Sequence, residues 1–224
     1  MQRTLVIGAA ALAIVAGAAY WLASTPATEP GISLGAANAQ ENGEAVDTSG
    51  IAEMTMGPED APVTVIEYAS FTCPHCATFH NGPGKELKAE YIESGDVQLI
   101  YRDVFFDRFG LWASMVARCG GEDRFFGITN MLYQQQKDWI ADGDPVKIAD
   151  NLRKIGKTAG LDAEQVDACL QDNDKAKALV AWFQEHAEEH DINATPTLVI
   201  NGEKHSNMSY ADLKEIVEAE LAKE

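Results

Sequence analysis

The chain has 224 residues, of which 46% are hydrophobic, so it is long enough for one substantial domain or for one domain with an insertion. Its 35 acidic and 17 basic side chains give a net charge of -18, which would repel nucleic acid. Length and charge therefore exclude a nucleic-acid-binding protein and a small scaffold that needs disulfides in place of a core.

The first segment of the chain is apolar and directs the protein to a membrane. After Arg3, residues 4–23 contain no charged side chain. The apolar part of a secretory signal is roughly 7 to 15 residues long, whereas a membrane-spanning helix needs about 20 and often has interfacial aromatics such as Tyr20 and Trp21. We expect residues 1–23 to be either a signal peptide or an N-terminal membrane anchor, and both would export the remainder to an oxidising compartment.

Residues 24–57 have the composition of a flexible tether. They are rich in Ala, Gly, Pro, Ser, Thr and Glu and have few large apolar side chains. Ordered structure is expected from about Pro58 onwards.

A strand, a helix and a second strand are expected next. The stretch PVTVIEYAS at 62–70 is β-branched and apolar enough for a buried strand. The stretch SFTCPHCATFH at 70–80 follows it, with Pro74 in the first turn of a helix, where its missing N–H costs nothing. The stretch VQLIYRDV at 97–104 predicts the second strand.

The rest of the chain is mainly helical. Residues 111–190 contain several helical segments and no comparable strand, which indicates a helical insertion. The stretch TLVI at 197–200 and the Asn201-Gly202 turn then predict a β-hairpin. A closing helix begins after its capping residue, Ser209.

Cys73 and Cys76 lie two residues apart at the predicted start of the first helix. A helix N-terminus has free N–H groups and a partial positive charge, which favour a thiolate on Cys73. Pro74 and His75 lie between the cysteines, and a protonated His75 would act in the same direction. Cys76, one turn into the helix, is expected to be more buried and less acidic. Cys73 is therefore the candidate for the attacked sulfur, and Cys76 for the resolving sulfur.

Two other roles for this pair are disfavoured. A zinc site needs four ligands, usually from two closely spaced pairs, and the remaining cysteines, Cys119 and Cys169, are solitary. A structural disulfide across two residues would close a very small loop and remove little entropy from the unfolded chain. The spacing favours a redox-active pair and no metal.

The order of these features resembles that of the DsbA family of thiol-disulfide oxidoreductases. The resemblance rests on the Cys-Pro-His-Cys tetrapeptide, the strand VIEYASFT before it and ATPTLVING far downstream, and it covers about 58–224. It implies an α/β fold in which residues 58–109 and 191–224 form a thioredoxin-like domain and residues 110–190 form an inserted helical domain.

The resemblance also implies a function. We expect a periplasmic oxidase, either secreted or tethered to the inner membrane by residues 4–23, that donates the Cys73-Cys76 disulfide to cysteine-containing exported proteins. It would act as a monomer without a cofactor and be re-oxidised by a quinone-coupled membrane protein. Two alternatives stay open: a disulfide reductase or isomerase that is kept reduced, and a non-enzymatic tethered module that binds unfolded chains.

Thr195 and Pro196 stand directly before the predicted hairpin. A lone Thr-Pro pair is usually a turn. In thioredoxin-like folds a cis-proline lies at this place against the active disulfide, so the resemblance implies that Pro196 is cis. It also implies that the Thr195 backbone pairs with an extended substrate chain by strand addition.

Glu67 and His80 each have two possible roles. Glu67 interrupts the first strand six residues before Cys73. It is either a buried acid that shuttles the proton of Cys76, as the resemblance implies, or a carboxylate at the rim with its head in water. His80 stands where many DsbA proteins have an acid; it could tune Cys76 or be an ordinary half-buried histidine.

Cys119 and Cys169 both lie in predicted helices of the insertion, beside apolar residues. In an exported protein, an even number of cysteines favours a second disulfide over two free thiols. Such a bridge is found in some DsbA-like proteins and is absent from others. We expect a structural disulfide between Cys119 and Cys169.

Overall fold

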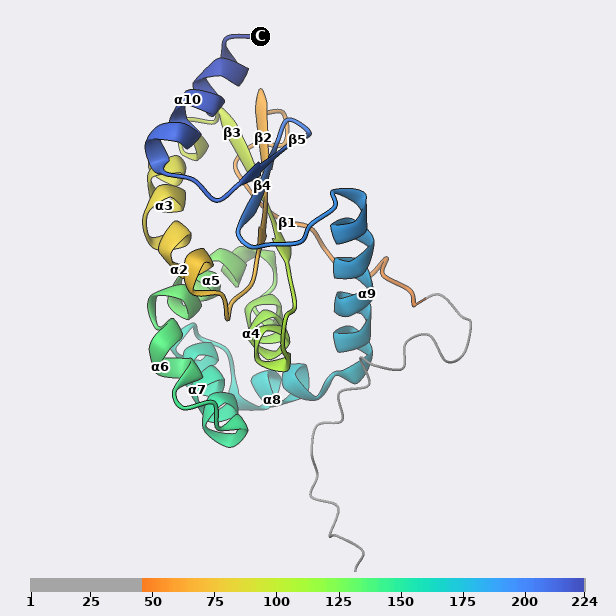
Figure 1. Ribbon diagram of the computed structural model, residues 1–224. Coiled ribbons are helices and arrows are strands. Elements are labelled where there is room, and N and C mark those ends of the chain that lie inside the picture. The colour runs from red at the N-terminus through yellow and green to blue at the C-terminus, as the bar shows by residue number, and fades with distance from the viewer. Residues whose placement is uncertain (1–45, 224) are drawn as a thin grey trace, which may run out of the picture. The chain divides into compact units, whose positions relative to one another are not determined.

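A mixed β-sheet organises residues 46–223, which are the residues that the computed structural model describes (Figure 1). Its strand order is β1-β3-β2-β4-β5, and β2 and β3 are parallel while the other neighbours are antiparallel. The strands of the sheet are β1 (Met54–Met56), β2 (Val63–Ala69), β3 (Val97–Asp103), β4 (Thr197–Ile200) and β5 (Glu203–Ser206).

Helices cover both faces of this sheet (Figure 1). One group comes after β2 or β5 in the sequence and belongs to the thioredoxin-like part: α2 (Pro74–Asn81), α3 (Pro83–Leu87), the π-helix η2 (Lys88–Ile92) and α10 (Tyr210–Leu221). The other group lies between β3 and β4: α4 (Arg108–Cys119), α5 (Glu122–Gln134), α6 (Gln136–Ile140), α7 (Pro145–Thr158), α8 (Ala163–Gln171) and α9 (Asn173–Glu189).

The alternation of side chains along β2 sends successive residues to different layers. Val63 and Val65 are fully buried in a cluster with residues of α2, α3, η2 and α10. Ile66 and Tyr68 point to the opposite face, where they pack with Phe183 of α9. β2 is therefore a central strand covered on both sides, which explains its nearly continuous apolar sequence.

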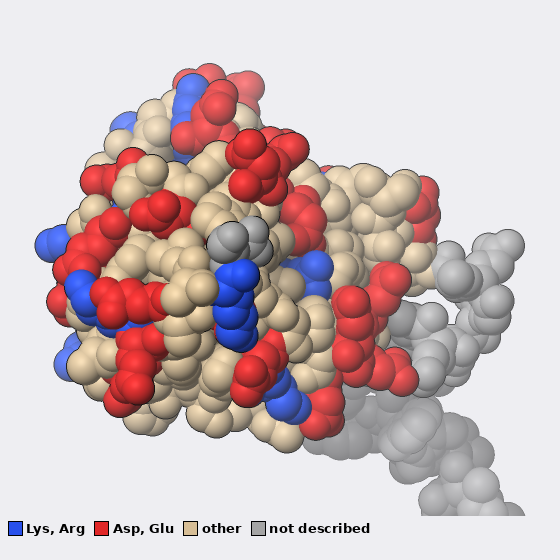
Figure 2. Space-filling model, turned by 90° about the horizontal axis from the view of Figure 1, so that it is seen from above, with Lys and Arg blue, Asp and Glu red and all other residues tan. Residues whose placement is uncertain are grey.

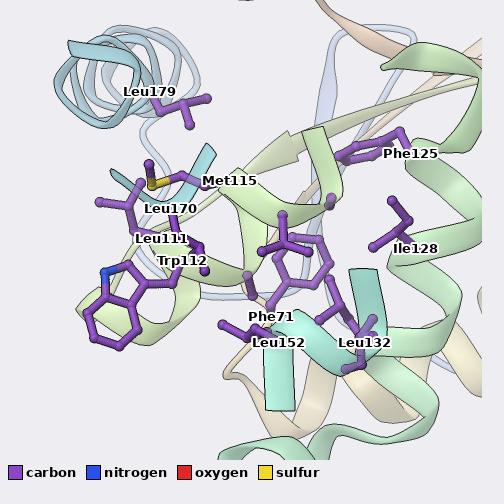
Figure 3. Packing of buried hydrophobic residues seen from close by; sticks show 14 of the residues in the cluster. Phe71, Leu111, Trp112, Met115, Phe125, Ile128, Leu132, Leu152, Leu170 and Leu179 are labelled. Carbon is purple, nitrogen blue, oxygen red and sulfur yellow. The ribbon is translucent and has the colours of Figure 1, made fainter. Parts of the chain in front are cut away.

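The largest cluster of buried residues lies among the helices that follow β3. Figure 3 shows Phe71, from the loop after β2, surrounded by side chains of this cluster such as Leu132 and Leu152. The Phe71 ring is also stacked on Tyr101 of β3, with the ring centroids 5.7 Å apart. The loop before Cys73 is thus anchored in the helical core by an aromatic side chain.

The expectation of a tether as far as residue 57 is wrong at its C-terminal end. Strand β1 pairs with β3 within this range, and Ile51 and Met54 are buried. A strand of three residues is too short to show a periodic pattern, so its order comes from pairing with β3 and not from its own sequence. The predicted leader at 1–23 and most of the tether lie outside the described residues. Among residues 46–223, no helix is long and apolar enough to cross a membrane.

The surface agrees with the acidic composition. On the face shown in Figure 2, Asp and Glu side chains are spread over most of the visible outline, and Lys and Arg are interspersed among them. Several of the described basic side chains are paired with acidic ones, such as Lys214 with Glu90 at 2.7 Å. Exposed pairs of this kind contribute little to stability.

A disulfide joins the end of α4 to α8, between Cys119 and Cys169. Their Cα atoms are 6.0 Å apart, and the two residues are 50 positions apart in the sequence. Both residues are half-buried. The disulfide closes a long loop that contains α5, α6 and α7.

Removal of this disulfide should destabilise the protein. In a Cys73→Ser/Cys76→Ser background, replacing both Cys119 and Cys169 with Ala should lower the free energy of unfolding by about 2–4 kcal/mol, because the unfolded chain regains the entropy of a loop of some fifty residues. Urea unfolding measures the change. The matched control is the background protein treated with a reductant, which should lose the same amount, and an unchanged urea midpoint would show that the bridge contributes nothing.

Candidate active site

Cys73 and Cys76 lie where β2 passes into α2. Cys73 is the N-cap of α2, with an extended backbone, and Pro74 occupies the first helical position. The Cys73 side chain is half-buried, whereas Cys76 is fully buried. Both are free thiols in the structure. Within the described residues, no group of three or more Cys, His, Asp or Glu side chains could hold a metal ion.

The surroundings of the two sulfurs push their pKa values in opposite directions. Partial burial opposes ionisation of Cys73, but hydrogen bonds from the Thr195 side chain, from Cys76 and from the His75 backbone outweigh it, so the pKa of Cys73 is lowered. Burial raises the pKa of Cys76 strongly, and the nearby Glu67 adds to this shift. Cys73 is therefore the more acidic thiol and Cys76 the one that holds its proton.

The Thr195-Pro196 peptide bond is cis, and it lies against Cys73. The Cys73 thiol donates to the backbone oxygen of Thr195 at 3.5 Å. The Thr195 hydroxyl is buried and has no hydrogen-bond partner in the thiol form. A hydroxyl in this position is free to donate to a sulfur that loses its proton.

A groove of about 380 Å3 opens beside this peptide bond. His75 lies on one side of it, and Thr195, Pro196 and His205 are among its other lining residues. The His75 side chain is exposed, and its contribution to Cys73 comes from the backbone N–H, not from the ring. The groove thus runs beside β5 to Thr195, whose backbone oxygen is in contact with the Cys73 thiol.

Glu67 is an interior residue, and its carboxyl does not lie at the rim. Its side chain is 3% exposed, and Oε1 has no hydrogen-bond partner. Burial raises the pKa of Glu67 to about 8. The carboxyl is therefore mostly protonated at neutral pH, close enough to Cys76 to influence its ionisation.

His80 lies in the last turn of α2, half-buried against α5. Its ring is 4.8 Å from that of Tyr133, and Nε2 is 3.4 Å from the side-chain oxygen of Asn130. Burial is the main cause that lowers the pKa of His80. The imidazole is consequently neutral at pH 7.

The structure adds two polar residues that the sequence did not indicate. Gln136, at the start of α6, is buried and donates through Nε2 to the backbone oxygens of Phe71 and Cys73, at 2.8 and 2.9 Å. Asp107 caps α4 and accepts from the hydroxyl of Thr72 at 2.6 Å. Both hold the loop before α2 from elements far along the chain. The helix-capping position of Asp107 was the only sequence signal for either residue.

Comparisons with known proteins agree with this geometry. The thioredoxin family model matches residues 49–219. A protein of Rickettsia prowazekii that carries the name protein-disulfide oxidoreductase is 30% identical over 170 residues, which are 75% of this chain and 61% of the relative. The chain thus spans about three fifths of that relative. Disulfide bond formation protein D of Bacillus subtilis is 27% identical over 74% of this chain and 76% of that protein.

Solved structures agree on the fold. The crystal structure of alpha-DsbA1 from Wolbachia pipientis superposes with a TM-score of 0.71 at 23% identity, covering 76% of this chain and 92% of that one. The predicted fold, thioredoxin-like with inserted helices, is confirmed by this likeness. The strands and helices are arranged as in alpha-DsbA1, and because the family model matches most of its length, the chain belongs to the thioredoxin family.

Proposed function

We propose that this protein is a thiol-disulfide oxidoreductase that acts mainly as an oxidase. One observation carries the proposal: two thiols of opposite character lie together at the N-terminus of α2. The accessible sulfur of Cys73 has a lowered pKa, and the buried sulfur of Cys76 has a raised one. A disulfide between them is poised to break, because reduction releases a stabilised thiolate on Cys73.

The reaction follows from thiol-disulfide exchange. A substrate thiolate attacks Cys73 Sγ, the Cys73–Cys76 bond breaks, and Cys76 leaves as a thiolate. A second substrate thiolate then attacks the substrate sulfur of the mixed disulfide, so that the substrate is oxidised and Cys73 is released as a thiolate. Each turnover transfers two electrons to the protein.

Glu67 supplies the proton that the departing sulfur needs. Once the Cys73–Cys76 bond is broken, the stable form of Cys76 is the protonated thiol over the whole physiological pH range, because its pKa is raised. The protonated carboxyl of Glu67 is the nearby acid within the same buried region. Proton transfer to Cys76 would leave no buried thiolate, which removes a large desolvation cost.

Substrates would bind along the groove beside Thr195. The edge strand β5 and the Thr195 backbone can pair with an extended chain, and the groove would hold residues next to the substrate cysteine. Cysteine-containing exported proteins fit this role. The location would be the periplasm, with re-oxidation by a quinone-coupled membrane protein and with the protein acting as a monomer.

A reductase or isomerase uses the same residues and differs in the partner that sets the redox state of Cys73. A lowered thiol pKa favours the oxidase, since it stabilises the reduced form. The non-enzymatic binding module would use the groove but not the sulfurs.

Activity measurements on cysteine variants separate these functions. The oxidised protein should convert a reduced two-cysteine peptide to its disulfide, and Cys73→Ala should abolish this conversion, because no other described sulfur can be attacked at the groove. Cys119→Ala/Cys169→Ala is the matched control and should keep the oxidase activity. Retained function in Cys73→Ala would support the binding module, and refolding of a scrambled multi-disulfide substrate by the reduced protein would support the isomerase.

The relative stability of the two redox forms should follow the ionisation of Cys73. The pKa of Cys73 is lowered in the folded, reduced protein, so ionisation of this thiol stabilises the reduced form. This stabilisation is fully present above the ordinary thiol pKa of about 8.5 and is lost as the pH falls through the pKa of the folded protein. The reduced form should therefore melt higher than the oxidised form at pH 8, and the gap should narrow toward pH 5. A higher melting temperature for the oxidised form at pH 8 would contradict the oxidase proposal and favour a reductase.

Glu67 should cost stability at neutral pH. The pKa of Glu67 is about 8 in the folded protein and about 4.3 in the unfolded chain, so the carboxyl ionises more readily when the protein is unfolded. The resulting loss of stability is absent below pH 4 and grows as the pH rises between these two values. Glu67→Gln should raise the free energy of unfolding of the reduced protein by about 3 kcal/mol at pH 7, and the gain should shrink to below about 1 kcal/mol at pH 4.5. Urea unfolding across this range tests the prediction, and Glu185→Gln, at an exposed position of α9, is the control. A pH-independent difference would mean that Glu67 is ionised in the fold.

A further inference from the structure

An open cavity of about 490 Å3 lies between β3, the α2–η2 segment and α5. Exposed residues such as Lys85 and Lys88 line its mouth, whereas the buried side chains of Glu67 and Thr129 belong to its interior. It shares no lining residue with the groove beside Thr195. The buried carboxyl of Glu67 thus has an opening of its own to solvent.

The interior of this cavity has unsatisfied polar atoms. Oε1 of Glu67 and the hydroxyl of Thr129 are buried and have no hydrogen-bond partner within the protein. Buried polar atoms almost always have a partner, and a polar cavity much larger than one water molecule can supply it as water. The cavity is therefore suited to hold water that reaches the Glu67 carboxyl.

His80, which is half-buried, lies on the wall of the same cavity. Its ring packs on Tyr133, whose hydroxyl is 2.6 Å from that of Tyr101, another lining residue. A neutral imidazole can accept a proton on one nitrogen and release one from the other. Of the described histidines, His80 alone lines this cavity.

We propose that the cavity is the proton path between solvent and Glu67, and that His80 passes protons along it. The inference rests on the proposed function and adds the route by which Glu67 is recharged. When the Cys73–Cys76 bond breaks, Cys76 takes the proton of Glu67, and the carboxylate regains one from water in the cavity. His80 gives a proton to that water and takes another from bulk solvent, so it ends each cycle unchanged. His80 acts through Glu67 and does not touch the reacting sulfurs.

The path lies apart from the groove in which a substrate would bind, so a bound substrate would not block it. A chain bound along the groove would cover Thr195 and the half-exposed side of Cys73. The cavity opens between other elements of the fold. Glu67 can therefore be reprotonated while a substrate chain is joined to Cys73 in the mixed disulfide.

Several charged or titratable groups surround the path. Lys85, Lys88 and Glu93 face it from α3, η2 and the turn after η2. Lys88 adds to the lowering of the pKa of His80. Tyr101 and Tyr133 face Glu67 and Cys76 from β3 and α5, and burial raises the pKa of both phenols well above the ordinary value, so they stay neutral.

The test follows reduction of the Cys73–Cys76 disulfide by dithiothreitol, which requires the same proton at Cys76 whether or not the protein is an oxidase in the cell. His80→Asn keeps a polar side chain without a titrating nitrogen. It should slow single-turnover reduction by about tenfold at pH 9, where the carboxyl of Glu67 starts ionised and the proton for Cys76 has to come along the path; this is less than the 10²–10⁴ of a group that donates directly to a reacting atom. Added imidazole should restore the rate, and the reduction potential should stay unchanged. His186→Asn, the same replacement outside the cavity, should match the wild type.

A second pair of variants tests the cavity without touching a titrating group. Gly127 lines it from α5, and an added Cβ at this position meets no atom within 4 Å. Gly127→Met should fill the space, slow the reduction and block rescue of the His80→Asn protein by imidazole. Gly127→Ala, which adds only the Cβ, should leave the rate unchanged.

The outcomes are separable. An unchanged rate of reduction in both His80→Asn and Gly127→Met overturns the proton path. A slow His80→Asn protein whose reduction potential shifts in step with its rate also overturns it, since His80 would then tune the sulfurs. A wild-type protein that is reduced normally by dithiothreitol but does not oxidise a two-cysteine peptide overturns the proposed function and leaves the path standing.

Discussion

The active site depends on one side chain that holds the loop before α2 in place. Gln136 donates to the backbone oxygens of both Phe71 and Cys73, so the loop cannot move without breaking one buried and one partly buried hydrogen bond. Each such bond contributes about 1 kcal/mol, and the loss of one partner would leave a buried carbonyl unsatisfied at a higher cost. With the loop fixed, Cys73 lies against Thr195 and Cys76 is enclosed.

This arrangement buries two ionisable groups, the Glu67 carboxyl and the Cys76 thiol, at one place in the fold. A carboxyl without a partner at Oε1 and a thiol with a raised pKa lie together inside the fold. Buried polar groups of this kind lower stability, and they persist where the surrounding structure over-determines them. The buried aromatic contacts of Phe71 with Tyr101 and Tyr133, together with the Cys119–Cys169 disulfide, provide that support.

The sequence predicted what local chemistry determines. The positions of Cys73 and Pro74 at a helix start follow from rules that act within a few residues, and so does the turn after β4. β1 was missed because three residues carry no period, and its order depends on a partner strand more than forty residues away. Gln136 gave no signal, since a glutamine in a predicted helix is usually exposed and its partners lie more than sixty residues earlier. The burial of Glu67 could not be decided from the sequence, because it depends on the helices that pack over β2.

The helices between β3 and β4 contribute directly to the chemistry of the site. α6 supplies Gln136, which positions Cys73. α5 supplies Thr129, which lines the cavity together with Glu67, and Tyr133, whose hydroxyl contacts that of Tyr101. A thioredoxin-like core without these helices would still place two cysteines at a helix N-terminus. Cys76 belongs to the buried cluster of these helices, so without them burial would raise the pKa of its thiol less. The inserted helices therefore add to the difference between the two sulfurs, and in the proposed oxidase this difference would direct electrons from a substrate to the protein.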